Sequence, residues 1–189
     1  MIKDVYTECP SYESERFLIR FCEPSDAVDL FEVYSDKKAV PFFNSDNCGG
    51  DDFYYKTVDR MRQAVEYWIW EYSRKGFVRW TILDKVSKKS VGTIELFNRK
   101  ADDFFSNCGI LRLDLRSDYE KSELIFEILG LIVPPSFDLF KCQMIATKAF
   151  PTAYERKKAM DKYGFSETEN KLIGTHDGIA YENYCIIYK

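Results

Sequence analysis

Two acidic side chains, Glu95 and Asp114, could carry out acid–base chemistry, because each falls within a run of residues typical of a β-strand. The runs are VGTIELF (Val91 to Phe97) and GILRLDL (Gly109 to Leu115). A strand carboxylate that is partly removed from water has a raised pKa and can then take a proton near neutral pH. The alternative is that both are ordinary acids on the solvent-facing side of a half-buried strand.

The segment that follows, from Asp114 to Glu127, is typical of a turn and the start of a helix, and a helix start can bind phosphate. Its first N–H groups lack partners within the helix and carry a partial positive charge. Between Asp114 and Glu123, however, four acids stand against Arg116 and Lys121, so the segment is net negative by two. Each carboxylate close to a phosphate would cost on the order of 1 kcal/mol near the surface.

A second interpretation of this segment needs no ligand. Ser117 and Glu120 have the S-x-x-E spacing of a capping box, in which both side chains satisfy N–H groups at a helix start. The helix would then begin near Asp118, and its own side chains would occupy the donors that a phosphate needs. The sequence leaves both interpretations open.

The elements that must position these residues alternate between strands and helices. Strands are predicted near residues 17–21, 77–83, 91–97, 109–115, 143–149, 165–169 and 181–187. Helices are predicted near residues 25–34, 61–75, 118–133 and 152–164. Pro134 and Pro135 should kink or end the third helix. This order predicts an α/β fold with one central sheet, in a single domain that covers residues 1–189.

The composition predicts a folded domain that binds neither nucleic acid nor membrane. The chain has 189 residues, of which 46% are hydrophobic and 16% aromatic, enough for one packed core. The net charge is −4, and Lys and Arg are spread among acids rather than gathered on a basic face. No apolar run approaches the ~18 residues of a membrane span, and the N-terminus MIKDVYTECP has no apolar signal segment. We therefore expect a cytoplasmic protein.

The cysteines and the single histidine predict no metal site and no disulfide framework. The six cysteines are widely spaced without a CxxC pair, which is typical of reduced and mostly buried thiols. His176 lies in the turn-like stretch GTHDG, where a solvated imidazole is the simplest expectation. A hydrolase or a thiol enzyme that depends on this histidine is therefore disfavoured.

Three segments resemble a known family. ESERFLIRFCEPSDAVDLFEVYSD (Glu13 to Asp36) is similar to the start of the ribosomal-protein N-acetyltransferases, with an acidic–Arg pair before the first strand and a D-A-x-x-L helix after it. The stretch from Glu127 to Phe165, which closes on DKYGF, follows the same branch without a gap, and VGTIELF is similar to the strand that ends the central hairpin. The chain thus resembles the GCN5-related N-acetyltransferase (GNAT) superfamily. The resemblance implies a central mixed, mostly antiparallel twisted sheet flanked by helices.

The resemblance implies acetyl-CoA as co-substrate. In the family it lies in a V-shaped gap between the fourth and fifth strands, and the fourth would be Gly109 to Leu115 here. The family's pyrophosphate loop, R/Q-x-x-G-x-G/A, is matched by EKSELI, with Glu120, Glu123 and Ile125 at the three marked positions. The cofactor-binding residues that the resemblance implies are Leu113, Leu115, Lys121, Ser122, Glu123, Leu124 and Arg156.

The implied activity is transfer of acetyl to a primary amine, on a protein N-terminus or a small molecule, with Glu95 or Asp114 as general base. Three positions where the family often places functional side chains hold Ala153, Arg156 and Met160 instead, so no residue inherits the role of acid by position.

The alternative function is a GNAT-fold protein that has lost acetyl-CoA binding and binds another ligand or a partner. An aromatic-rich group, Tyr54, Tyr55, Tyr67 and Trp70, predicts either a partly apolar acceptor or the docking of a second chain as a homodimer.

Overall fold

The computed structural model describes residues 4–189, and its central feature is an eight-stranded sheet in the order β1-β2-β3-β4-β5-β6-β10-β7. The strands are β1 (Tyr12–Glu13), β2 (Phe17–Phe21), β3 (Val78–Asp84), β4 (Lys89–Arg99), β5 (Cys108–Leu115), β6 (Met144–Lys148), β7 (Ser166–Glu167) and β10 (Tyr184–Tyr188). Neighbouring strands are antiparallel except β5 and β6, which are parallel. The predicted mixed, mostly antiparallel sheet is confirmed. A short hairpin of β8 (Leu172–Ile173) and β9 (Ala180–Tyr181) was not predicted.

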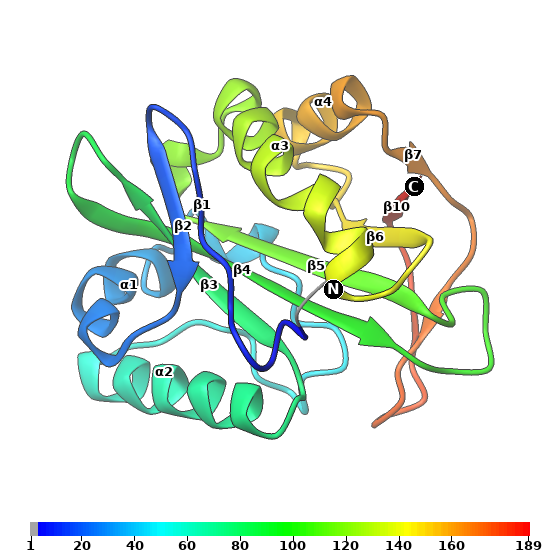
Figure 1. The fold of residues 1–189 in the computed structure, drawn as a ribbon, viewed down its shortest axis with the longest axis horizontal. Helices are drawn as coiled ribbons and strands as arrows, with labels where there is room; N and C mark the ends of the chain where they lie inside the picture. Colours follow the sequence, from blue (N-terminus) through cyan, green and yellow to red (C-terminus); the bar gives the residue numbers. More distant parts are fainter. Residues whose placement is uncertain (1–3) are drawn as a thin grey trace.

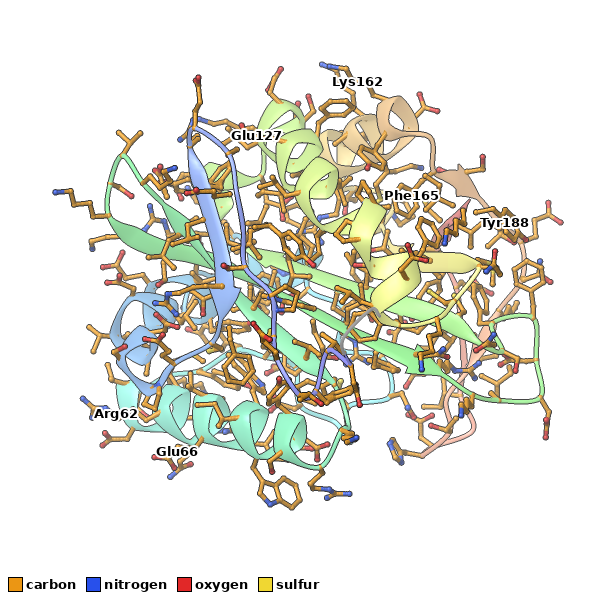
Figure 2. All side chains as sticks on the ribbon, in the orientation of Figure 1. Arg62, Glu66, Glu127, Lys162, Phe165 and Tyr188 are labelled. Atoms are coloured by element: carbon orange, nitrogen blue, oxygen red, sulfur yellow. The ribbon has the colours of Figure 1, made fainter. Side chains whose placement is uncertain are left out.

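Four helices cover the two faces of this sheet (Figure 1). Helices α3 (Ser122–Leu139) and α4 (Tyr154–Tyr163) lie on one face, and α1 (Ala27–Tyr34) and α2 (Val58–Ser73) lie on the other. Along β3, Trp80 belongs to the core under α3, while the alternate residue Arg79 contacts Trp68 of α2. On α2 itself, Arg62 and Glu66 point away from the sheet (Figure 2). The predicted amphipathic pattern therefore holds for α2.

The third helix differs from its prediction at both ends. It begins at Ser122 rather than near Asp118, because residues Ser117–Tyr119 form a separate 3-10 turn without a side-chain cap. The predicted capping box of Ser117 and Glu120 is therefore wrong. The helix also continues through both prolines to Leu139, because Ser136 and Phe137 extend its buried face beyond them.

Four of the six cysteines are buried and the histidine is exposed, as their sequence context predicts. All six cysteines are free, and Cys22, Cys108, Cys142 and Cys185 are buried. His176 is exposed in the loop between β8 and β9. Within residues 4–189, none of the helices is both long enough and apolar enough to cross a bilayer. The same residues contain no group of three or more His, Cys, Asp and Glu side chains arranged to hold a metal ion.

Two glycines should respond in opposite ways to alanine. A Cβ at Gly92 would lie 2.3 Å from the carbonyl oxygen of Asp114, whereas one at Gly130 on α3 would meet nothing within 4 Å. We expect Gly92→Ala to lower the free energy of unfolding by about 2 kcal/mol or more, since β4 and β5 would have to separate. Gly130→Ala should raise it by up to about 1 kcal/mol through helix propensity. Urea unfolding followed by circular dichroism measures both, and equal effects would contradict the close approach at Gly92.

Candidate active site

The two parallel strands at the centre of the sheet part from each other partway along their length. Paired residues run from Cys108 and Met144 to Leu111 and Thr147, and β5 then continues unpaired on that side to Leu115. We call the space between β5 and β6 beyond Leu111 the strand gap. It lies where the family resemblance implies the acetyl-CoA site.

The main chain of Leu113 and Leu115 faces the strand gap. Arg116 N donates to Val91 O, so the even-numbered residues of β5 form the hydrogen-bonded pairs with β4. Hydrogen-bonded and non-bonded pairs alternate along an antiparallel ladder, so the N–H and C=O groups of the odd-numbered residues point the other way. The structure thus places these two predicted residues where their main chain can meet a ligand, although contact with a cofactor stays a prediction.

Arg156 occupies the strand gap. Its side chain is 2% exposed, and its Nη1 donates to Leu113 O at 2.7 Å and to Phe42 O at 3.2 Å. Its Nε and Nη2 both donate to the carboxylate of Glu120. Arg156 is therefore buried, although it lies on a helix whose other charged residues are mostly exposed. The guanidinium bridges from α4, across the edge of β5, to the connection between α1 and α2.

A carboxylate also occupies the first donor of α3. In any α-helix the first N–H groups have no acceptor within the helix. Here the N–H of Ser122 donates to Glu155 Oε2 at 2.9 Å, so α4 supplies an anion at the position where the resemblance implies a diphosphate. The N–H groups of Glu123 and Leu124 follow in the same turn.

The predicted loop residues divide into exposed and core positions. Lys121 and Glu123 are exposed, Leu124 is half-buried, and Ser122 is buried. Ile125, which stands where the family has a small residue, is fully buried in the core under α3. Its side chain therefore packs into the core, and the group that occupies the first N–H of α3 is the carboxylate of Glu155.

Glu95 and Asp114 belong to one buried network on the α1 and α2 side of the sheet. Arg79, which is 1% exposed, pairs with Glu95 through Nη2 and with Asp114 Oδ2 at 3.2 Å through Nη1. Arg112 Nη1 donates to the second oxygen of Glu95 at 2.6 Å. The hydroxyl of Tyr34 on α1 lies 2.7 Å from Asp114 Oδ2. Two arginines and two carboxylates thus balance each other inside the protein.

The two carboxylates of the network differ in their readiness to take a proton. Burial raises the pKa of Glu95, but attraction to Arg79 and Arg112 outweighs it, so the net shift is downward. For Asp114, burial dominates and the pKa is raised, although Arg79 and the hydrogen bond from Tyr34 oppose the shift. Asp114 Oδ1 is also buried without a hydrogen-bond partner.

The alternative of a solvent-facing position is therefore wrong for both acids, because Glu95 on β4 and Asp114 on β5 are both buried. Only Asp114 has the raised pKa expected of a general base, since both oxygens of Glu95 are held by arginines. Sequence reasoning missed Arg79, Tyr34 and Glu155. The register of the β3–β4 hairpin sets Arg79 directly opposite Glu95, a signal that was available from the strand pattern.

The connection between α1 and α2 closes the far side of the strand gap. Asp46 in this connection accepts from Lys148 Nζ at 2.7 and 2.8 Å and from the hydroxyl of Tyr184 at 3.0 Å. Arg112 Nη2 donates to the carbonyl of Asp46 at 2.7 Å. Asp46 thereby contacts residues at the end of β6, the start of β10 and the middle of β5.

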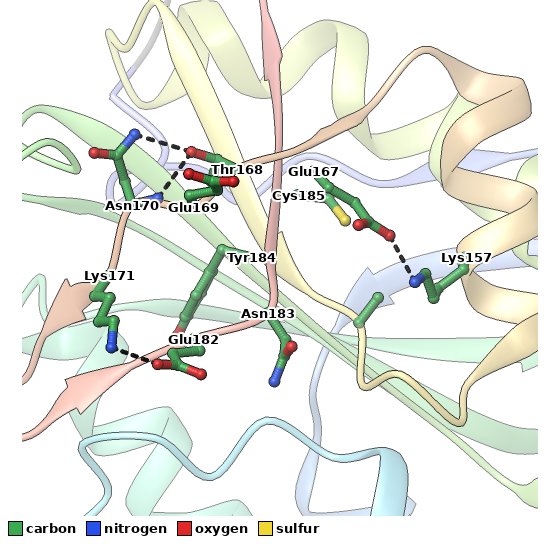
Figure 3. Close-up of a pocket in the computed structure, with 11 residues that line it drawn as sticks. Lys157, Glu167, Thr168, Glu169, Asn170, Lys171, Glu182, Asn183, Tyr184 and Cys185 are labelled. Carbon is green, nitrogen blue, oxygen red and sulfur yellow. Dashed lines mark hydrogen bonds and ion pairs between the residues drawn. The ribbon is translucent and has the colours of Figure 1, made fainter.

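A hollow of about 250 Å³ lies elsewhere, between β7, β10 and the start of α4 (Figure 3). Its charged side chains pair with each other, as Lys157 does with Glu167 at 2.6 Å and Lys171 with Glu182 at 2.5 Å. None of the predicted site residues lines it, so the hollow and the strand gap are separate features.

Neutralising the two network acids should have different effects on stability. Glu95→Gln leaves Arg79 and Arg112 without a carboxylate between them, and breaking such a buried pair costs about 3–5 kcal/mol. Asp114→Asn removes a charge that burial already disfavours, so we expect a smaller loss at pH 7. Glu66→Gln, an exposed change on α2, should stay within about 0.5 kcal/mol. Urea unfolding at pH 7 ranks the three variants.

The pH dependence of these losses follows from the signs of the two shifts. Glu95 has a lowered pKa in the folded state, so its stabilisation is present above its ordinary value of 4.5 and is lost on acidification through the folded pKa. The penalty of Glu95→Gln should therefore shrink in acid. Asp114 has a raised pKa, so its contribution is present below its ordinary value of 3.8 and is lost as pH rises through the folded pKa. The penalty of Asp114→Asn should instead shrink as pH rises. Unfolding curves from about pH 2 to 8 that move the two penalties in parallel would contradict this assignment.

Comparison with known proteins bears on the fold. No family model matches the chain, and no curated protein matches it by sequence. Solved structures do match. A GNAT-family acetyltransferase from Bacillus anthracis is 18% identical, with a TM-score of 0.68 over 95% of this chain and 98% of that one. A ribosomal-protein-alanine acetyltransferase from Vibrio fischeri is also 18% identical, with a TM-score of 0.69 over 95% and 96% of the two chains.

A third similar structure, the microcin self-immunity acetyltransferase MccE in complex with acetyl-CoA and AMP, is 12% identical, with a TM-score of 0.68 over 93% of this chain and 94% of that one. At such identities the likeness shows the fold. The chain has the GNAT fold, as the resemblance in its sequence predicts.

Proposed function

We propose that the protein is an acetyl-CoA-dependent N-acetyltransferase that acetylates a primary amine, on a protein N-terminus or a small molecule. The observation that carries the proposal is the parting of β5 from β6 beside the start of α3. This arrangement offers main-chain groups to an extended ligand and helix N–H groups to its phosphates. The likeness of the fold to acetyltransferases, including one in complex with acetyl-CoA, supports it.

Each predicted contact has a counterpart in this geometry. The main chain of Leu113 and Leu115 would hold the pantetheine arm along the edge of β5. The N–H groups of Ser122, Glu123 and Leu124 would bind the diphosphate. Lys121 and Arg156 would supply positive charge, Lys121 from the exposed loop and Arg156 after exchange of its partner. In the present structure Glu120 pairs with Arg156, and Glu155 accepts a hydrogen bond from the N–H of Ser122.

Asp114 is the best-suited proton acceptor. In direct transfer, the amine nitrogen attacks the thioester carbonyl, the carbon–sulfur bond breaks, and the nitrogen loses a proton. Tyr34 and Arg79 fix Asp114 through Oδ2, which leaves Oδ1 without a partner, and burial raises the pKa of the carboxyl group. Positioning of the two substrates and polarisation of the carbonyl by main-chain N–H groups would supply the rest of the catalysis.

A second candidate function is favoured by the position of Arg156. Because this arginine fills the strand gap and is fully paired, the chain could be a GNAT-fold protein that no longer binds acetyl-CoA. It would then act as a binding module for another ligand or a partner protein. The two candidates differ in whether acetyl-CoA binds at all.

Calorimetric titration with CoA and acetyl-CoA, followed by an assay of free thiol release with a panel of peptide and small-molecule amines, tests the proposal. We expect measurable heat and amine-dependent release of CoA. Millimolar acetyl-CoA that gives neither heat nor a shift in melting temperature would favour the binding module instead.

The role of Asp114 has its own test. Asp114→Asn should lower kcat by about 10²- to 10⁴-fold, the usual contribution of a general base, while changing the Kd for CoA little. In the wild-type protein, kcat/KM should rise with pH through the raised pKa of Asp114, and the variant should lack that rise. Glu66→Gln serves as the matched control. Wild-type turnover by Asp114→Asn would place the base elsewhere.

A further inference from the structure

The side chains at the mouth of the strand gap form a closed set of three. Arg156 and Glu155 are neighbours in the first turn of α4, and Glu120 lies two residues before Ser122, which starts α3. Arg156 bonds Glu120, and Glu155 accepts from the N–H of Ser122. The carboxylate of Glu120 thus neutralises the buried guanidinium in the strand gap, and the carboxylate of Glu155 accepts the hydrogen bond from the first N–H of α3.

Burial makes the first of these contacts hard to break. The side chain of Arg156 is 2% exposed and that of Glu120 is 8% exposed, so neither can exchange its partner for water without a change in structure. A buried ion that loses its partner costs several kcal/mol. Arg156 can therefore leave Glu120 only when another anion takes the place of that carboxylate.

The second contact is of a different kind. Glu155 is an exposed residue, and only the hydrogen bond to Ser122 N fixes its carboxylate at the helix start. It can rotate away into water at little cost. While it stays, it satisfies the donor with the same type of charge that a phosphate would bring.

We propose that Glu120 and Glu155 are internal competitors for the phosphates of CoA, and that together with Arg156 they form a lock on the strand gap. The free protein is self-inhibited, and CoA enters by exchange: its diphosphate replaces Glu120 on Arg156 and Glu155 on Ser122 N. Arg156 then withdraws from Leu113 O, which frees the edge of β5 for the pantetheine arm. This inference rests on the proposed function and adds to it a barrier built from the chain's own acids.

The test compares acids that differ only in their place in the lock. Glu155→Gln and Glu120→Gln each remove one competitor, whereas Asp161→Asn removes the same charge from an exposed position further along α4 without touching the lock. We expect Glu155→Gln to tighten the Kd for CoA by roughly 5- to 10-fold, and Asp161→Asn to change it less than about twofold. Pantetheine, which lacks the diphosphate, should bind Glu155→Gln and wild type alike.

Calorimetry at constant ionic strength separates the outcomes, and Glu155→Gln keeps the test valid if Glu120→Gln fails to fold. CoA binding by wild type that neither Glu155→Gln nor Glu120→Gln strengthens would overturn the lock and leave the proposed function standing. Equal tightening by Asp161→Asn would reduce the effect to general charge repulsion and also overturn it. Binding by a lock variant but not by wild type would support it. The lack of CoA binding in every variant would remove both the lock and the proposed function.

Discussion

Buried positive charge is the constraint on which the rest of this structure depends. Arg79, Arg156 and Lys148 lie inside the protein, and removing an ion from water costs several kcal/mol unless an opposite charge accompanies it. Each has a carboxylate partner from a different part of the chain. Arg79 pairs with Glu95 and Asp114, Arg156 pairs with Glu120, and Lys148 pairs with Asp46.

These partnerships set the local structure around the strand gap. Glu120 cannot cap the helix start and also pair with Arg156, and the buried pair prevails. For that reason α3 begins at Ser122, after a separate turn, instead of at the capping box. Asp46 likewise fixes the connection between α1 and α2 against the end of β6 and the start of β10, through Lys148 and Tyr184. The shape of the candidate site thus follows from where the charges are matched.

The sequence predicts the parts of the fold that depend on local pattern. Phe17–Phe21 and the other long strands lie near their predicted positions, and α2 forms where a helix is predicted, with one buried face. The site is less predictable, because its contacts join residues far apart in the chain. Arg156 and Glu120 are 36 residues apart, and an arginine on a helix with a polar pattern looks like a surface residue. The alternation of charged and apolar residues on β5 likewise resembles a solvated strand, and only the arginines on β3 and β5 show that its charged face is buried.

The ion pair of Arg156 and Glu120 stabilises the fold but opposes the binding of acetyl-CoA, and the free energy needed to break it sets the size of this effect. If opening the strand gap costs about 3 kcal/mol, at the low end for a broken buried pair, only about one molecule in 150 is open before ligand binds, and the apparent affinity falls by that factor. The binding of a diphosphate can offset this free energy, because charge-assisted contacts between a guanidinium and phosphate are about twice as strong as neutral hydrogen bonds. A ligand without an anionic group at that position cannot offset the free energy of opening. The strand gap therefore selects ligands first by their charge, because a neutral ligand of suitable shape would bind weakly as long as Arg156 stays paired with Glu120.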